Sequence, residues 1–131
     1  MIVVDASAFI ELLAYEGSRG ERARRVLGGD VGWCAPEHWK AEVFSAVRGL
    51  MLGGQLSEVF AARAITRLPR LAVDGVDLDG LLGDMWKLRH QVSGYDAAYV
   101  ALARQRGLTL VTADARLARA AVRHCRVESL A

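Results

Sequence analysis

Four of the fifteen acidic residues fall where their carboxylates can act together. Asp5 directly follows the apolar run Ile2–Val4, and Asp114 comes shortly after a second apolar run. If both runs are parallel strands, their carboxyl ends meet at one edge of a sheet, where open α/β folds bind their ligands. Asp96 stands at the start of a helix, and Glu42 lies in the second turn of another helix, beside its apolar face. We therefore expect the four carboxylates to share one rim of the fold.

Each carboxylate taken alone also has a purely structural explanation. Asp5 and Asp114 can cap the helices that follow them. Asp96 stands three residues after Ser93, close to the spacing of a capping box, and Glu42 can lie on the surface. Together, however, four carboxylates at one rim would repel one another unless a cation neutralised them. An all-oxygen set of ligands selects Mg²⁺ or Mn²⁺ over zinc.

A divalent cation at this rim would indicate chemistry carried by a metal-activated water. No Ser–His or Cys–His pair is evident, so a protein nucleophile is not indicated. Ser7 and Thr112 each stand two residues from one of the acids, and we expect their hydroxyls to orient a carboxylate or a water. Both are also common turn and cap residues. The histidines share no metal-binding spacing and are expected in packing or at the surface: His38, His90 and His124.

The elements that must position these residues are short apolar strands alternating with helices. The predicted strands are Ile2–Val4, Gly32–Ala35, Leu71–Val73, Leu108–Val111 and Cys125–Val127. The predicted helices are Ser7–Ala14, Arg19–Leu27, Glu37–Leu52 with Pro36 leading its first turn, Ser57–Leu68, Leu78–Val92, Ser93–Arg104 and Ala115–Val122. This alternation predicts an α/β fold, a three-layer α/β/α sandwich with a central parallel sheet.

Length and composition bound the class of protein. The 131 residues are 53% hydrophobic and contain two prolines, as expected of one globular domain over 1–131. The longest apolar run, Ala97–Ala103, is far shorter than the roughly 20 residues of a membrane span, and no basic leader precedes the first strand. Cys34 and Cys125 have no metal-type spacing. We expect a cytoplasmic protein with reduced thiols and no contact with a membrane.

Four segments of the sequence carry a family pattern. They are Ile2-Val3-Val4-Asp5-Ala6-Ser7-Ala8, Pro36-Glu37 followed by Glu42, Tyr95-Asp96-Ala97-Ala98-Tyr99-Val100-Ala101-Leu102-Ala103, and Leu110-Val111-Thr112-Ala113-Asp114 with Leu117. In this order and context they resemble the PIN-domain nucleases and, within that group, the VapC-type toxins of bacterial toxin–antitoxin pairs. The resemblance covers nearly the whole chain. It departs from the family at Ser45, where an Asn often follows the helix glutamate by three residues.

The resemblance implies an Mg²⁺- or Mn²⁺-dependent endoribonuclease that hydrolyses RNA phosphodiester bonds. Carried over residue by residue, the catalytic quartet of the family falls on Asp5, Glu42, Asp96 and Asp114. We take Asp5 and Asp96 as the principal metal ligands, with Glu42 and Asp114 binding the metal directly or through water. The implied partners are the RNA substrate and a cognate VapB-type antitoxin, in a homodimer or a toxin–antitoxin hetero-oligomer.

Two further expectations concern contacts with RNA and with the antitoxin. The outer face of the second helix is basic and is expected to contact RNA phosphates, although it also fits a solvated face, through Arg19, Arg22, Arg24 and Arg25. An antitoxin segment is expected to insert an arginine among the four carboxylates. It would dock on the apolar helix face around Trp39, Val43 and Leu50.

Other classes of protein fit the residues less well. A haloacid-dehalogenase-type phosphotransferase needs a second acid two residues after the first, where this chain has Ser7. A response-regulator receiver needs a Lys late in the chain, and the last one here is Lys87. The alternative that stays open is a catalytically silent PIN-like fold that binds RNA or protein. The presence of all four acids counts against it.

Overall fold

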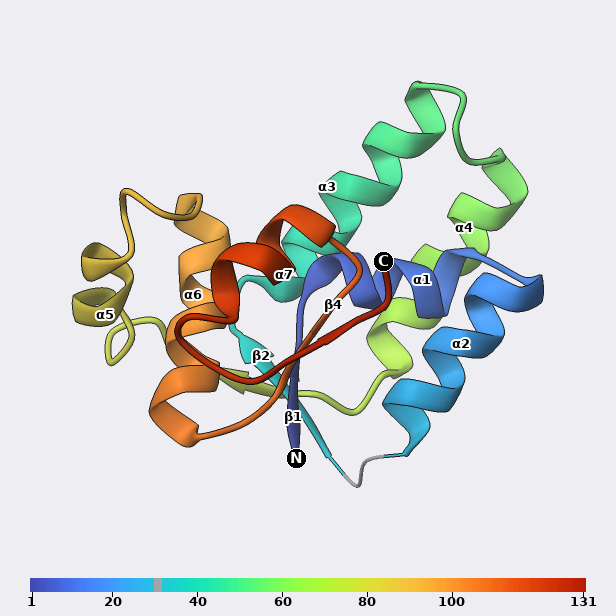
Figure 1. The fold of residues 1–131 in the computed structure, drawn as a ribbon. Helices are drawn as coiled ribbons and strands as arrows, with labels where there is room; N and C mark the ends of the chain where they lie inside the picture. Colours follow the sequence, from blue (N-terminus) through green and yellow to red (C-terminus); the bar gives the residue numbers. More distant parts are fainter. Residues whose placement is uncertain (30–31) are drawn as a thin grey trace.

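A parallel sheet lies at the centre of the fold. The computed structural model describes residues 1–29 and 32–131, and within them five parallel strands form one sheet in the order β3-β2-β1-β4-β5. The chain leaves the central strand β1 toward β2 and later returns on its other side with β4, so the strand order reverses beside β1 (Figure 1). Ligands of open α/β sheets bind at such a point. The strands are β1 (Ile2–Val4), β2 (Trp33–Pro36), β3 (Asp74–Val76), β4 (Leu110–Thr112) and β5 (Val127–Ser129).

Helices cover both faces of this sheet. Their bounds are α1 (Ala6–Ala14), α2 (Gly17–Gly28), α3 (Trp39–Leu52), α4 (Glu58–Arg67), the 3-10 helix η1 (Leu68–Arg70), α5 (Leu82–Lys87), α6 (Gly94–Arg106) and α7 (Ala115–Ala121). α1 contacts α2, α3 and α4, whereas α5 lies against α6, and α6 contacts β1, β2 and β4. Right-handed crossovers place α1 to α4 on one face and α5 to α7 on the other (Figure 1). The predicted three-layer α/β/α sandwich is confirmed.

The helix that carries Asp96 is packed against the middle of the sheet. Every residue of its uncharged run Ala97–Ala103 is buried, as the sequence predicted, and α6 ends at Gly107 with a left-handed φ of 64°. The helix connects β3 to the parallel strand β4, so it runs back against the strands and begins at their carboxyl edge. This direction brings Asp96 to the edge at which β1 and β4 end.

Two predicted boundaries around β2 and β3 are wrong. Pro36 does not lead a helix, because it ends β2, and α3 begins at Trp39. The third strand occupies Asp74–Val76 instead of Leu71–Val73, since it is Asp74–Val76 that pair in register with β2. This edge strand contains two exposed residues, Asp74 and Gly75, so its sequence lacks the apolar run that marks a buried strand.

The helix predicted over Leu78–Val92 is much shorter in the structure. Only Leu82–Lys87 are helical, and residues 88–91 form turns that lead into α6. Gly80 and Gly83 weaken the helical preference at the start of the segment. β4 and β5 each begin two residues later than predicted. None of the helices in the described residues is long and apolar enough to cross a membrane.

Candidate active site

Asp5 is a buried carboxylate at the carboxyl end of the central strand. Its side chain is 3% exposed and caps α1, with Oδ1 accepting the Ala8 backbone N–H at 2.9 Å. The Ser7 hydroxyl donates to Oδ1 at 2.7 Å, and the Thr112 hydroxyl donates to Oδ2 at 2.5 Å. Ser7 Oγ also accepts the Ala113 backbone N–H at 2.9 Å, which ties the end of β4 to the start of α1. Both hydroxyls singled out in the sequence thus contact this one carboxylate.

Burial makes Asp5 an unusually weak acid for a carboxyl group. Its pKa is raised from 3.8 to about 6, mainly because the group is removed from water and to a smaller extent because of the charge of Asp96. The hydrogen bonds from Thr112, Ser7 and Ala8 act in the opposite sense, because they stabilise the ionised form. Near neutral pH the group is ionised but costs the fold stability, so a cation beside it would be favourable.

Glu42 is held by two aromatic residues that the sequence analysis did not select. The Tyr99 hydroxyl donates to Glu42 Oε1 at 2.8 Å, and His38 Nε2 lies 3.4 Å from the same oxygen. Burial raises the pKa of Glu42, and the Tyr99 hydrogen bond partly offsets this rise. Burial lowers the pKa of His38, which stacks on Tyr95 with ring centroids 5.2 Å apart.

The spacing of Tyr99 and His38 from Asp96 and Glu42 in the sequence indicates that they share helix faces with these acids. Tyr99 stands three residues after Asp96 on α6, and His38 stands four residues before Glu42, so each pair shares a helix face. His38 was expected in packing or at the surface, and its two ring nitrogens are buried without a hydrogen bond in the described part of the chain. Its ring therefore approaches Glu42 closely without a hydrogen bond.

Asp96 and Asp114 stand at the starts of α6 and α7. The Asp96 backbone N–H donates to Ser93 Oγ at 3.3 Å, so the serine half of the expected capping box is present. Asp114 caps α7 by accepting the backbone N–H groups of Arg116 at 2.9 Å and Leu117 at 3.1 Å. Burial raises the pKa of Asp96, and the charge of Asp114 adds to that rise.

The four carboxylates influence one another through Asp96. Its charge raises the pKa of both Asp5 and Glu42, and the charge of Asp114 raises that of Asp96. Among residues 1–29 and 32–131, no three His, Cys, Asp or Glu side chains lie close enough to hold a metal ion. The donor chemistry nevertheless fits a hard cation, since Oδ2 of Asp5 receives a single hydrogen bond and keeps a lone pair for a ligand bond.

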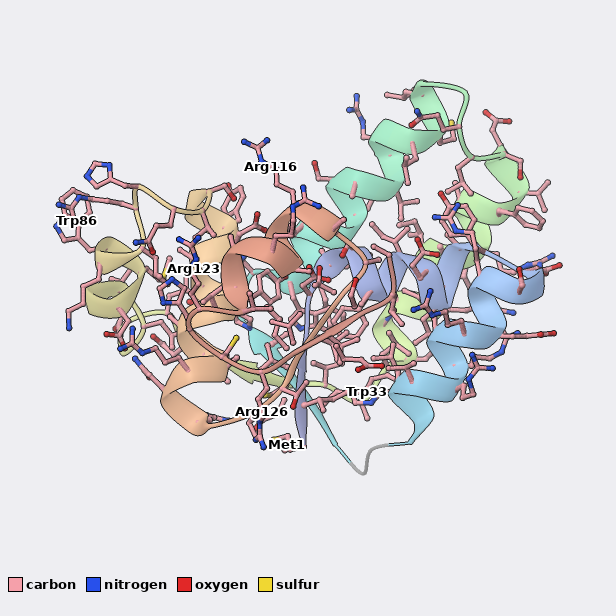
Figure 2. The ribbon with its side chains drawn as sticks, viewed as in Figure 1. Met1, Trp33, Trp86, Arg116, Arg123 and Arg126 are labelled. Carbon is pink, nitrogen blue, oxygen red and sulfur yellow. The ribbon has the colours of Figure 1, made fainter. Side chains whose placement is uncertain are left out.

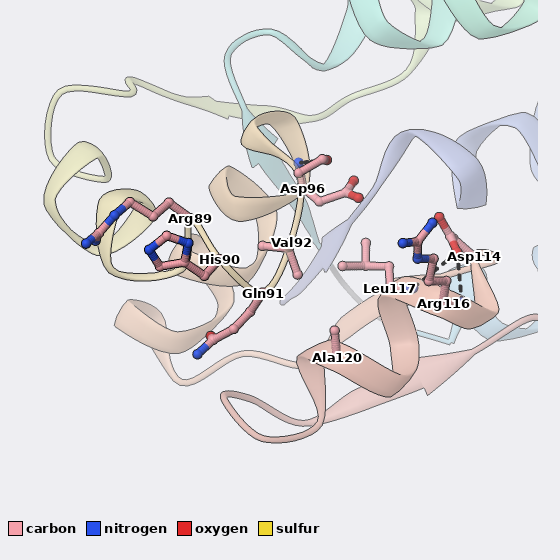
Figure 3. A pocket seen from close by; sticks show the side chains of 10 residues that line it. Arg89, His90, Gln91, Val92, Asp96, Asp114, Arg116, Leu117 and Ala120 are labelled. Atoms are coloured by element: carbon pink, nitrogen blue, oxygen red, sulfur yellow. Dashed lines mark hydrogen bonds between the residues drawn. The ribbon is translucent and has the colours of Figure 1, made fainter.

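Two pockets open beside these acids. One, of about 460 Å³, lies between the turns that precede α6 and the first turns of α7, and both Asp96 and Asp114 line it (Figure 3). The other, of about 320 Å³, is lined by Glu42 together with His38, Ser45 and Tyr95. Ser45, the residue that departs from the family pattern, therefore borders the Glu42 side of the site.

The basic face of α2 is partly engaged by the fold itself. Arg19 Nε donates to Glu11 at 2.9 Å, and its guanidinium lies 3.7 Å from the centre of the Tyr15 ring. Arg22 donates to the carbonyl oxygens of Ser129 at 3.1 Å and Leu130 at 3.3 Å. Arg24 and Arg25 are exposed on the same helix. Contact of this helix with RNA stays a prediction.

The apolar face of α3 that was expected to dock an antitoxin segment is turned into the core, and Leu50 is partly buried against that core. Trp39 and Val43 are buried in the core, where the Trp39 ring packs on Phe9 with centroids 4.6 Å apart. They cannot offer a docking surface, because they belong to the core and α1 packs against α3. The large apolar residues that α3 exposes are Phe44 and Leu52.

Comparison with known proteins shows the family of this chain. The family model described as "PIN domain" matches residues 2–123, so the chain belongs to the PIN-domain family. Ribonuclease VapC3 of Mycobacterium tuberculosis is 39% identical over 119 residues, covering 91% of this chain and 86% of that protein. Ribonuclease VapC1 of the same species is 37% identical over 127 residues, covering 96% and 95%. Within the PIN domains, the chain therefore belongs to the VapC-type ribonucleases, as its motifs indicated.

The fold also matches a solved member of that group. The crystal structure of Mycobacterium tuberculosis VapC20, titled a sarcin-ricin loop cleaving toxin, has a TM-score of 0.67 at 19% identity and covers 92% of this chain and 95% of its own. At this identity the match bears on the fold alone. It supports the α/β/α architecture.

Proposed function

We propose that this chain is the toxin of a toxin–antitoxin pair and that it cleaves RNA by metal-dependent hydrolysis of phosphodiester bonds. Membership of the VapC-type ribonucleases makes it an RNA-cleaving hydrolase. The observation that carries the rest is the Asp5 carboxylate, buried at the switch point of the sheet, held by two hydroxyls and electrostatically linked to Asp96. A buried carboxylate without a cation is costly, which favours a site built for one.

Each residue of the site has a separate role in the proposed reaction. Asp5 and Asp96 would hold Mg²⁺ or Mn²⁺, and Glu42 and Asp114 would hold the waters around it. When bound, the cation lowers the pKa of a water and stabilises the charge that develops on the phosphate. Ser7 and Thr112 fix the direction of the Asp5 carboxylate before the substrate arrives.

Glu42 is the residue best placed to accept a proton from the attacking water. Tyr99 and His38 both approach Oε1, which leaves Oε2 to accept a hydrogen bond from water. Burial raises the pKa of Glu42, and a higher pKa makes a carboxylate a better base. Tyr99 is thus a positioning residue that acts through Glu42.

The partners follow from the charge of the site and from the family. We propose a single-domain toxin that acts in the cytoplasm, where a VapB-type antitoxin silences it within a homodimeric or hetero-oligomeric assembly. The four carboxylates, three of which have raised pKa values, would strongly attract a guanidinium group. An antitoxin arginine inserted among them would compete with the metal for the same oxygens.

The deciding experiment is RNA cleavage by protein freed of any antitoxin. Cleavage should stop with chelator and return with Mg²⁺ or Mn²⁺. Asp5→Asn and Asp96→Asn should each lower the rate at least about a hundredfold, because each removes a charge that would hold the cation. Asp79→Asn, which removes an exposed acid elsewhere, is the matched control.

Two results would separate the proposal from its alternative. If Asp5→Asn cleaves RNA as fast as the unaltered protein, the assignment of the acids is wrong. If the unaltered protein binds RNA but cleaves none with either metal, the chain is a silent PIN-like binding module.

A further inference from the structure

The larger pocket beside the acids contains side chains that the proposed hydrolysis does not use. Asp96 and Asp114 form part of its wall, but the rest comes from residues 89–93 and from the start of α7. These include two arginines, Arg89 and Arg116, and two further hydrogen-bonding side chains, His90 and Gln91. Figure 3 shows Arg89 and His90 at one end of the pocket and Arg116 at the other, beside Asp114.

Arg116 is free to bind an anion. Its backbone N–H donates to Asp114, but in the described part of the chain its exposed guanidinium has no hydrogen bond or ion pair. Two acids close by would repel an RNA phosphate, so a substrate that reaches them needs a positive group at its side. The arginine in the first turn of α7 supplies that group, with a fork that matches two phosphate oxygens.

Beyond the opposite end of the pocket, Arg89 links the pocket wall to an exposed aromatic ring on α5 (Figure 2). Trp86 on α5 is 67% exposed, and the Arg89 guanidinium lies 4.4 Å from the centre of its ring. Arg89 is fixed there because one of its terminal nitrogens donates to the Trp86 carbonyl oxygen at 2.8 Å. An exposed Trp carrying an Arg is a platform on which an unpaired nucleobase stacks.

We propose that this pocket binds the nucleotide next to the scissile phosphate of a single-stranded RNA, which rests on the proposed function. Arg116 contacts a phosphate in the pocket, and the neighbouring base stacks on Trp86 and Arg89 beyond its opposite end. The volume of about 460 Å³ lies within the range of about 300–1,000 Å³ for pockets that enclose small ligands. A base can stack on Trp86 only when it is unpaired, which selects single strands, loops and bulges over duplex RNA.

Binding can be measured without cleavage. The probe is a fluorescently labelled single-stranded oligoribonucleotide of mixed sequence, titrated into an Asp5→Asn protein in which hydrolysis is blocked. Added to that background, Arg116→Ala or Trp86→Ala should each weaken binding about tenfold, because each removes a charged or stacking contact. Arg70→Ala is the matched control, since Arg70 is an exposed arginine that precedes β3, at the far edge of the sheet.

The dependence on salt identifies the phosphate contact. For Arg116→Ala the slope of log Kd against log salt should fall by about 0.7, the value for one phosphate on a single strand. Arg116→Lys should restore that slope, and Trp86→Ala should leave it unchanged. Binding of the same sequence as a duplex should not respond to Trp86→Ala. Both altered residues are exposed, so an unchanged melting temperature will show that the fold is intact.

Failure of this proposal is distinguishable from failure of the proposed function. If the unaltered enzyme cleaves RNA, while Arg116→Ala and Trp86→Ala leave its KM and its cleavage positions unchanged, the subsite is wrong and the ribonuclease assignment stands. If no RNA is cleaved, the ribonuclease assignment fails, and the affinity and salt slope still decide the subsite. Loss of antitoxin binding with unchanged RNA affinity would overturn the proposal and assign the pocket to a protein contact.

Discussion

At the scale of single residues, the buried Asp5 carboxylate lowers the stability of the folded protein at its own site. The carboxylate is removed from water, yet three hydrogen bonds keep it oriented toward the edge of the sheet. These bonds do not cancel the effect of burial, because its pKa remains raised to about 6. The ionised side chain therefore lowers the free energy of unfolding at neutral pH, and a bound cation would offset this loss.

The first prediction is that Asp5→Asn stabilises the metal-free protein in a pH-dependent way. The pKa of Asp5 is 3.8 when unfolded and about 6 when folded, so the folded state binds the proton more tightly. The protonated Asp5 carboxyl therefore favours the folded state. Its contribution to the free energy of unfolding is complete below pH 4 and is lost as the pH rises through 6, by about 3 kcal/mol in all. Urea unfolding at pH 4 and pH 7 should show the advantage of the Asn variant growing by that amount. An advantage independent of pH would contradict this account.

The second prediction concerns the Tyr99 hydroxyl. Tyr99→Phe removes a buried hydrogen bond to Glu42 and should lower the free energy of unfolding by about 1 kcal/mol. If Tyr99 positions Glu42, kcat for RNA cleavage should fall while KM stays constant, since the substrate is not contacted. The kinetic parameters on a defined RNA decide this, and an unchanged kcat would reduce Tyr99 to a packing residue.

At the scale of elements, close approach between helices is set by small residues. Gly20 of α2 is such a position, because a Cβ there would overlap the carbonyl oxygen of Tyr15, at the end of α1. Gly49 of α3 has the same residue type inside a helix, but a Cβ there would meet nothing within 4 Å. Gly20 is therefore required for packing between α1 and α2, whereas Gly49 affects only the helical preference of α3.

The third prediction uses this pair. Gly20→Ala should lower the free energy of unfolding by more than about 1 kcal/mol, because the backbone must shift to admit the methyl group. Gly49→Ala should raise it by about 0.5–1 kcal/mol, since alanine favours the helix and meets no obstacle. Chemical unfolding of both variants measures the two values, and equal effects would refute the packing argument.

At the scale of the whole molecule, the site exists only when the sheet and both helical layers are assembled. The four acids come from β1 and from the starts or first turns of α3, α6 and α7. Unfolding separates them along the chain, so a cation that bridges them binds the folded state and shifts the equilibrium toward it.

The fourth prediction is that millimolar Mg²⁺ or Mn²⁺ raises the melting temperature by several degrees. At a hundred times its Kd a ligand adds about 2.7 kcal/mol to stability. The rise should shrink strongly in Asp96→Asn, whose charge acts on both Asp5 and Glu42. KCl at matched ionic strength is the control for screening, and an equal rise with KCl would argue against a specific site.

Much of this organisation was present in local sequence. Apolar runs of strand length, the uncharged run Ala97–Ala103 and the cap residues Asp5, Ser93 and Asp114 act over a few neighbouring residues, so they predicted the alternating elements and the α/β/α sandwich. The order of acids along the chain indicated the VapC-type PIN domain. That these four acids carry the catalysis stays a prediction.

Contacts between distant parts of the chain were decided only by the tertiary structure. Thr112 lies 107 residues from Asp5, and Tyr99 lies 57 residues from Glu42, so neither hydrogen bond has a local signature. The register of β3 depends on its partner strand β2, and the pocket around Arg116 depends on how the turns before α6 meet α7. The physical reason is that helical and strand preferences arise between near neighbours, whereas burial, charge coupling and pairing arise from whichever segments the fold brings together.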